Sequence, residues 1–155
     1  MRILGSLWVA CLLLMRPSYA QDIVPIVPIR IVGMKYPGLA MAVGIRGDLK
    51  INCIISSDGK VVSAEIAEAK SRPFFEDRTR GVRDLLGKPA QENVLQWIFP
   101  SSTSQSQRSV TLLFKFDLIG KADPSKGTKF VFDSPDTVTI TAEVSDVILE
   151  SGEAI

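Results

Sequence analysis

The side chains that could perform chemistry in this chain are few in kind. None of the 155 residues is histidine, and the two cysteines are Cys11 and Cys53. Carboxylates occur in close pairs, the arrangement that general acid–base catalysis or a metal site would use: Glu65/Glu68, Glu76/Asp77 and Asp133/Asp136. None of these pairs has the spacing of a calcium loop, and the histidines and paired cysteines that bind transition metals are missing. The sequence therefore predicts no metal site and no cofactor.

Cys53 is the one thiol to consider as a nucleophile or a redox group. No histidine exists to act as its base, and Cys11 lies in the leader described below. The residues around Cys53 alternate in polarity and place it on the buried face of a strand, where a free thiol is usually inert. The lack of histidine also excludes a serine-hydrolase triad, and residues 56–60 lack the glycine spacing of a phosphate loop. We therefore expect no enzymatic activity.

Residues 1–20 have the pattern of a secretory signal peptide. Arg2 is followed by the apolar residues 3–15, and Ser18-Tyr19-Ala20 offers small residues where signal peptidase cleaves. The apolar run is shorter than the ~20 residues of a membrane-spanning helix. We expect an exported protein of the periplasm or the medium, with an uncleaved inner-membrane anchor as the alternative.

Without Arg2 and Arg16 of the leader, 16 basic residues stand against 17 acidic ones. No basic stripe remains, so we expect no nucleic-acid partner. Pro25 and Pro28 predict an extended lead-in over residues 21–33. One domain is expected over residues 34–145, followed by a frayed tail over residues 146–155.

The polarity pattern predicts an α+β fold. Alternation typical of half-buried strands occurs in five segments, namely 47–55, 60–67, 109–118, 128–132 and 136–144. Helical spacing occurs over residues 38–43 and again from Pro89 to Ile98, where Pro100 ends it. Residues 75–86 fit either a short helix or an irregular loop. We expect an antiparallel sheet of three to five strands with two short helices packed on one face.

Three short motifs follow one another along the chain. These are Tyr36-Pro37 with Ala40, the turn Ser57-Asp58-Gly59-Lys60, and Trp97-Ile98-Phe99-Pro100. With the order of the elements, they resemble the C-terminal domain of the TonB energy-transducer family over residues 34–118. The resemblance implies structural roles for Tyr36, Pro37, Asp58, Gly59, Trp97, Phe99 and Pro100. Trp97 and Phe99 could instead form a recognition surface, but large aromatic side chains in a small domain favour the core.

The resemblance also implies a function, which is binding of protein partners without catalysis. In the family, one strand offers its backbone edge to an extended peptide of an outer-membrane receptor. The corresponding residues here are Val110, Thr111, Leu112, Leu113, Phe114, Lys115 and Phe116. The tail strand at residues 136–144 is an alternative occupant of that edge, which would suit an accessory envelope protein.

Two departures from the family weaken the case for energy transduction. True transducers carry an anchor with a functional histidine and a long proline-rich spacer, whereas this chain has no histidine and only a short stretch between Met15 and Met34. The sequence names neither the partner nor the oligomeric state.

Overall fold

The computed structural model describes residues 25–72, 78–104, 106–120 and 127–144. The predicted leader, the whole of the predicted tail and the pair Glu76/Asp77 lie outside these residues. In chain order the elements are α1 (Gly38–Ala42), β1 (Arg46–Ser56), β2 (Val61–Arg72), α2 (Thr79–Gly81), the π-helical turn η1 (Val82–Gly87), α3 (Lys88–Val94), β3 (Gln107–Gly120), β4 (Thr128–Asp133) and β5 (Thr137–Val144).

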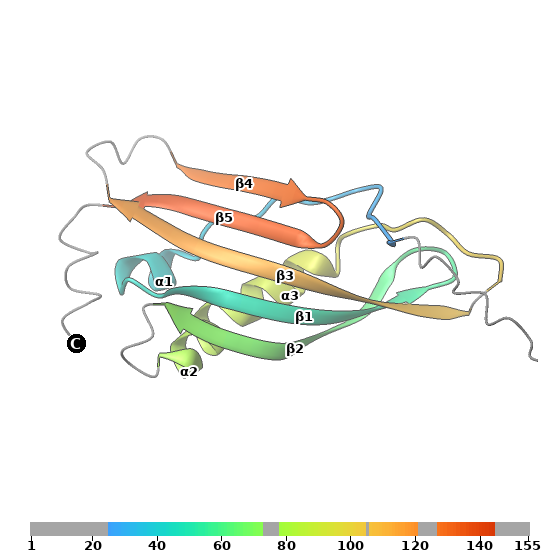
Figure 1. Cartoon of the computed structure of the whole chain (residues 1–155), viewed down its shortest axis with the longest axis horizontal. Helices are drawn as coiled ribbons and strands as arrows, with labels where there is room; N and C mark the ends of the chain where they lie inside the picture. Colours follow the sequence, from blue (N-terminus) through green and yellow to red (C-terminus); the bar gives the residue numbers. More distant parts are fainter. Residues whose placement is uncertain (1–24, 73–77, 105, 121–126, 145–155) are drawn as a thin grey trace, which may run out of the picture.

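The strands form one five-stranded sheet in the order β2-β1-β3-β5-β4 (Figure 1). This confirms the α+β class and the upper limit of the predicted strand number. Three of the four pairings are antiparallel, as expected, but β3 and β5 are parallel, so the sheet is mixed. The difference arises because β4 takes the outer edge and β5 returns between β4 and β3. Polarity patterns show which residues face the core, but they do not order the strands.

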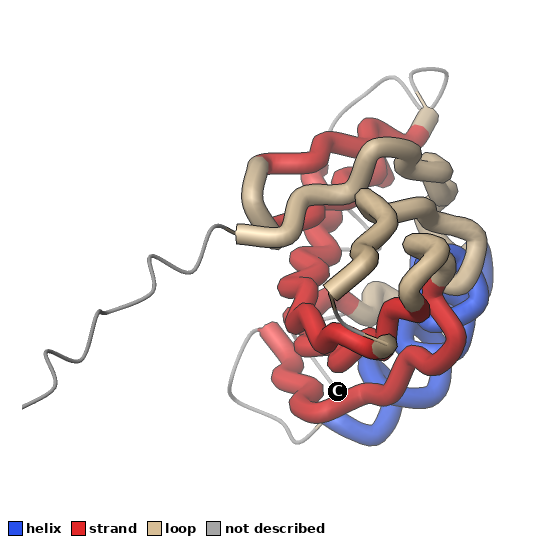
Figure 2. Tube along the Cα trace, turned by 90° about the vertical axis from the view of Figure 1, so that its right-hand side faces the viewer, coloured by secondary structure: helices blue, strands red, loops and turns tan. Residues whose placement is uncertain are grey.

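One face of the sheet is covered by the helices (Figure 2). Every second residue of the central strands is buried on this side, including Leu49, Ile51, Cys53 and Ile55 of β1. The intervening residues of β1, such as Lys50 and Asn52, are largely polar and lie on the uncovered face. This two-sided pattern is typical of a sheet with one solvated face, and it confirms the predicted alternation.

The helical segment before β3 is longer than predicted. Sequence patterns predict a helix from Pro89 and leave residues 75–86 as either a short helix or a loop, whereas helical structure runs without a break from Thr79 through α2, η1 and α3. Proline in a helix clashes with the carbonyl one turn earlier. The π-helical turn of η1, which is wider than an α-helical turn, directly precedes α3, where Pro89 stands in the first turn, and the helical segment continues past the proline. Val82, Leu86, Ala90 and Val94 are fully buried, and they hold the segment against the sheet.

Where the structure describes it, the lead-in contains no helix and a single β-bridge. Arg30 forms an isolated antiparallel bridge with Ile98, and the amides of Ile29 and Arg30 both donate to the Ile98 carbonyl. The lead-in is thereby fixed to the segment that follows α3. No helix among the described residues is long and apolar enough to cross a membrane.

Candidate functional site

The hairpin turn and the aromatic motif after α3 meet in space. The Phe99 amide donates a 2.8 Å hydrogen bond to the Gly59 carbonyl, and Lys60 forms a bridge with Ile98. Gly59 has a φ of +86°, and a Cβ atom there would lie 2.0 Å from the Phe99 carbonyl oxygen. Glycine is therefore required for two reasons. The turn needs a positive φ, and the Phe99 backbone leaves no room for a Cβ atom. Asp58 does not have a positive φ, so the turn is not of a primed type, although an Asp-Gly pair in a hairpin favours such turns.

Trp97 and Phe99 are core residues, 1% and 0% exposed. The Trp97 ring packs on Phe114 at 6.1 Å and meets Phe132 edge-on at 5.8 Å between ring centroids. Its indole N–H donates to the Asn93 side chain at 3.0 Å and to the Val32 carbonyl at 3.2 Å. These contacts place both aromatic residues in the core, with no face left for recognition.

Tyr36 of the first motif is a buried anchor. Its hydroxyl donates to the Ile45 carbonyl at 2.6 Å, and its ring meets Phe116 edge-on at 5.6 Å. Burial raises the pKa of Tyr36, and the nearby Asp117 charge raises it further. Pro37 precedes α1 as its cap residue. The motif thus ties α1 to the sheet by packing and one hydrogen bond.

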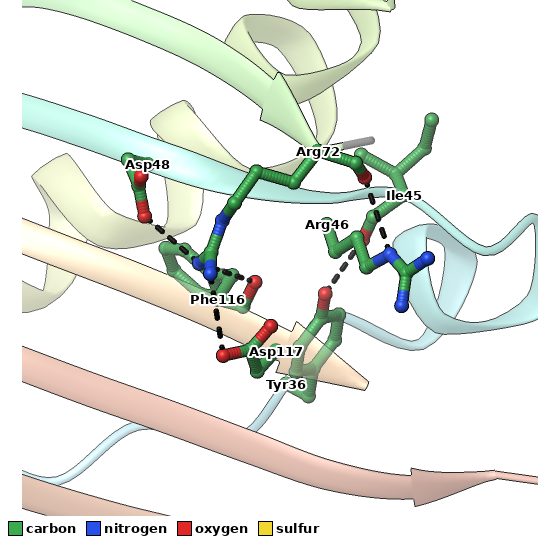
Figure 3. Close-up of polar contacts among 7 residues, drawn as sticks. All are labelled: Tyr36, Ile45, Arg46, Asp48, Arg72, Phe116 and Asp117. Atoms are coloured by element: carbon green, nitrogen blue, oxygen red, sulfur yellow. Dashed lines mark hydrogen bonds and ion pairs between the residues drawn. The ribbon is translucent and has the colours of Figure 1, made fainter. Parts of the chain in front are cut away.

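Arg72 joins three strands beside Tyr36 (Figure 3). Its guanidinium donates to Asp48 on β1 at 2.8 Å, and to Asp117 and the Phe116 carbonyl on β3 at 3.4 Å each. Sequence reasoning missed this cluster. The three charges are distant along the chain, and only strand pairing brings them together. Because the guanidinium contacts both carboxylates, the cluster links β2 to β1 and to β3.

The carboxylate pairs of the sequence do not assemble into a catalytic or metal centre in the described part of the chain. No group of three or more potential metal ligands occurs there. Hydrogen bonds from Lys50 and Lys70 lower the pKa of Glu68 to about 2, so it is ionised at neutral pH and cannot act as a general acid. Asp133 and Asp136 lie at the two ends of the β4–β5 turn.

Cys53 is buried on β1, and burial raises the pKa of its thiol to about 12. Because the thiolate is the reactive form, we expect native protein to react with a thiol reagent at pH 8 at least about 100-fold more slowly than unfolded protein. The measurement should use a Cys11→Ser background, so that Cys53 is the only thiol. Equal rates before and after unfolding would show that Cys53 is accessible.

The predicted peptide-binding edge is partly occupied by the chain itself. β5 pairs in parallel with residues 113–120 of β3, beginning at Leu113 opposite Thr137. Leu113, Phe114, Lys115 and Phe116 therefore have a strand beside them. No described strand lies on this side of Val110, Thr111 and Leu112. The predicted edge is therefore covered in its second half and open in its first half.

The open part of β3 borders a hollow. No described strand pairs with residues 107–112 on the side that β5 occupies further along. The parallel ladder begins at Leu113 opposite Thr137, because residues 134–136 form the turn between β4 and β5. A hollow of about 290 Å³ lies at this place, lined by Pro25, Ile26, Ser109, Val110, Thr111, Pro135 and Asp136.

Backbone groups of β3 face this hollow at alternate residues. The Leu113 amide donates to the Asp136 carbonyl at 2.9 Å, so its N–H points to the β5 side. Backbone groups alternate in direction along a strand, so Ser109 and Thr111 point theirs the same way. The hollow therefore combines backbone donors and acceptors that pair with no described strand with the apolar walls of Pro25, Ile26 and Pro135.

Comparison with known families matches this architecture. The sequence profile described as Gram-negative bacterial TonB protein C-terminal matches residues 32–118, more than half of the chain. The chain belongs to the TonB C-terminal family. The match runs from the lead-in nearly to the end of β3, and it ends before β4 and β5 begin. The search of curated proteins found none that matches.

Membership gives the coarse function. TonB C-terminal domains are non-enzymatic protein-interaction modules of the cell envelope, and they are associated with transport. They interact with proteins such as outer-membrane receptors. The β4–β5 hairpin, which occupies part of the expected edge, is an addition to the matched region of this TonB C-terminal domain.

Proposed function

We propose that this TonB C-terminal domain binds an extended peptide of an envelope protein at residues 107–112 of β3. The supporting observation is the hollow beside Ser109 and Thr111, where the strand has backbone groups directed away from β1 and no described strand next to it. A peptide added here would continue the line of β5. Main-chain hydrogen bonds would supply affinity, and side chains entering the hollow would supply selectivity.

The hollow favours a peptide with an apolar residue. A peptide side chain opposite Val110 would point to the helix-covered side, where Ile26 and Val110 pack partly buried against the core. Neighbouring peptide residues would point to the solvated face, near the exposed side chains of Ser109 and Thr111. An alternation of polar and apolar residues in the peptide follows from this geometry.

Substitution at Thr111 tests the proposal. Thr111→Pro removes the amide hydrogen on the open side, where proline is tolerated in a strand, and leaves the pairing with β1 intact. Thr111→Ala is the matched control, because it also loses the side-chain bond to Asn52 but keeps the amide. We expect capture of an outer-membrane protein by wild type and by Thr111→Ala, and at least a tenfold loss with Thr111→Pro.

Equal capture by both variants would refute strand addition at this place, provided that both melt like wild type. Hydrogen exchange gives an independent readout. Rapid exchange at the amides of Ser109 and Thr111, with protection of Val110 and Leu112, is expected for an open edge. Addition of the captured protein should then protect Ser109 and Thr111.

The second candidate is an accessory envelope protein whose edge is closed. The pairing of β5 with residues 113–120 favours it, because that hairpin covers the longer part of the β3 edge. Uniform protection along all of β3 without any partner would support this alternative.

A further inference from the structure

The outer side of β4 is an edge of the sheet that no described strand covers. It is separate from the peptide site proposed above, which lies on β3. β4 is the last strand in the sheet order, and Figure 1 shows it at the margin of the described structure. The opposite margin, β2, differs. There Gln91 donates to the Ala64 carbonyl at 2.7 Å and Arg83 to the Ile66 carbonyl at 3.3 Å, so helix side chains occupy backbone acceptors of that edge strand.

The direction of the β4 backbone groups follows from its neighbours. The bond from Leu113 to the Asp136 carbonyl directs the even-numbered residues of β5 to β3 and its odd-numbered residues to β4. β4 pairs its own odd-numbered residues with these, as in Val131 opposite Thr139. The amides and carbonyls of Thr128, Phe130 and Phe132 therefore face outward.

The lead-in contacts β4 without closing this edge. The Tyr36 amide donates to the Thr128 hydroxyl at 3.1 Å, and Gly33 lies beside the Phe130 ring. Both contacts involve side chains on the face that packs against the core, and neither uses an outward backbone group. The described residues place no strand beyond β4.

The charges of β4 are arranged symmetrically. Lys129 and Asp133 are both exposed, lie two residues on either side of Val131, and have no ion-pair partner among the described residues. A second β4 placed antiparallel, with a twofold axis at Val131, sets each Lys129 opposite Asp133 of the other copy. In the same register Phe130 lies opposite Phe132, so outward backbone groups of the two copies face each other as a hydrogen-bonded pair.

Burial adds a reason for the same register. Phe130 and Phe132 pack against the core but remain partly exposed. Across the twofold axis, Phe130 of each copy would lie directly opposite Phe132 of the other copy. Aromatic pairs on one face stabilise strand pairing. Edge strands are often protected by lysine, which repels a second copy when it stands alone. Here the opposite charge at the matching position removes that repulsion.

We propose that two copies of this chain associate through β4, antiparallel about Val131, to form a continuous ten-stranded sheet. The interface is isologous, with two Lys129–Asp133 pairs and two Phe130–Phe132 pairs. A single six-residue strand gives a small interface, so the dimer is weak and concentration-dependent. The peptide site at residues 107–112 lies on β3 and is left open in both copies.

Charge reversal tests the register. Lys129→Glu gives a copy with two acidic positions, and Asp133→Lys gives one with two basic positions. Sedimentation of the purified protein, up to about 1 mM, should show wild-type dimers and at least a tenfold weaker association of each single variant. The two single variants mixed together should associate again, as should the double variant alone.

Lys88→Glu is the matched control, because it makes the same charge change at an exposed helical residue far from β4. It should associate like wild type, and all variants should keep the melting temperature within a few degrees. A wild-type protein that stays monomeric throughout would overturn the proposal. A dimer unaffected by the single reversals, or one that fails to re-form in the mixture, would overturn it equally.

Discussion

Replacing Trp97 with alanine should lower the free energy of unfolding by about 3–5 kcal/mol. The substitution removes the largest fully buried side chain and its contacts with Phe114 and Phe132. It also leaves the Asn93 side chain and the Val32 carbonyl without the indole N–H. The loss is a large share of the roughly 5–15 kcal/mol that stabilises a small domain. Denaturant titration monitored by circular dichroism gives the value directly.

Leu95→Ala is the control for Trp97→Ala. Leu95 lies two residues before Trp97, is the C-cap residue of α3 and is 46% exposed. Its truncation should change the free energy of unfolding by less than about 1 kcal/mol. A Trp97→Ala protein with the wild-type unfolding midpoint would remove the basis for assigning this ring to the core.

Gly59→Ala should destabilise the fold by more than about 2 kcal/mol. The alanine side chain would need a φ of +86° and would place its Cβ 2.0 Å from the Phe99 carbonyl oxygen. Relief requires the turn to move, which breaks the hydrogen bond from the Phe99 amide to the Gly59 carbonyl. Thermal unfolding of the variant should show a clear loss, because the turn links β1, β2 and the end of α3.

Gly38→Ala serves as the matched comparison. Gly38 begins α1, its φ is negative, and no atom lies within 4 Å of the position a Cβ would take. Alanine there should be neutral or stabilising by up to about 1 kcal/mol, because it restricts the unfolded chain and favours helix. Equal melting temperatures for the two alanine variants would mean that Gly59 is not the point of contact between the two motifs.

Sequence patterns were most reliable where the physical cause is local. The alternation around Cys53 predicted β1 and its buried face, because successive side chains of a strand point to opposite sides. The Asp58-Gly59 pair predicted the hairpin, because glycine adopts a positive φ without strain. Trp97 and Phe99 were assigned to the core from their size, and both are buried.

Long-range contacts were beyond that reasoning. The choice between a helix and a loop over residues 75–86 stayed open, and a separate helix was expected from Pro89 because proline normally marks a first turn. The π-helical turn that directly precedes Pro89 has no simple sequence signal. The cluster of Arg72, Asp48 and Asp117 depends on the register of three strands. No local pattern contains that register.

The sequence by itself determined most of the local elements and the buried face of each strand, because these depend on residue type and short spacing. It also excluded any site that needs a histidine side chain, since the sequence contains none. Only the tertiary structure decided that β5 lies parallel beside β3 and that β4 ends the sheet. Both strands have an alternating apolar face and could pair with β3, so the choice depends on packing against the whole core. Within the described structure, that choice leaves one side of residues 107–112 and the outer side of β4 without a neighbouring strand.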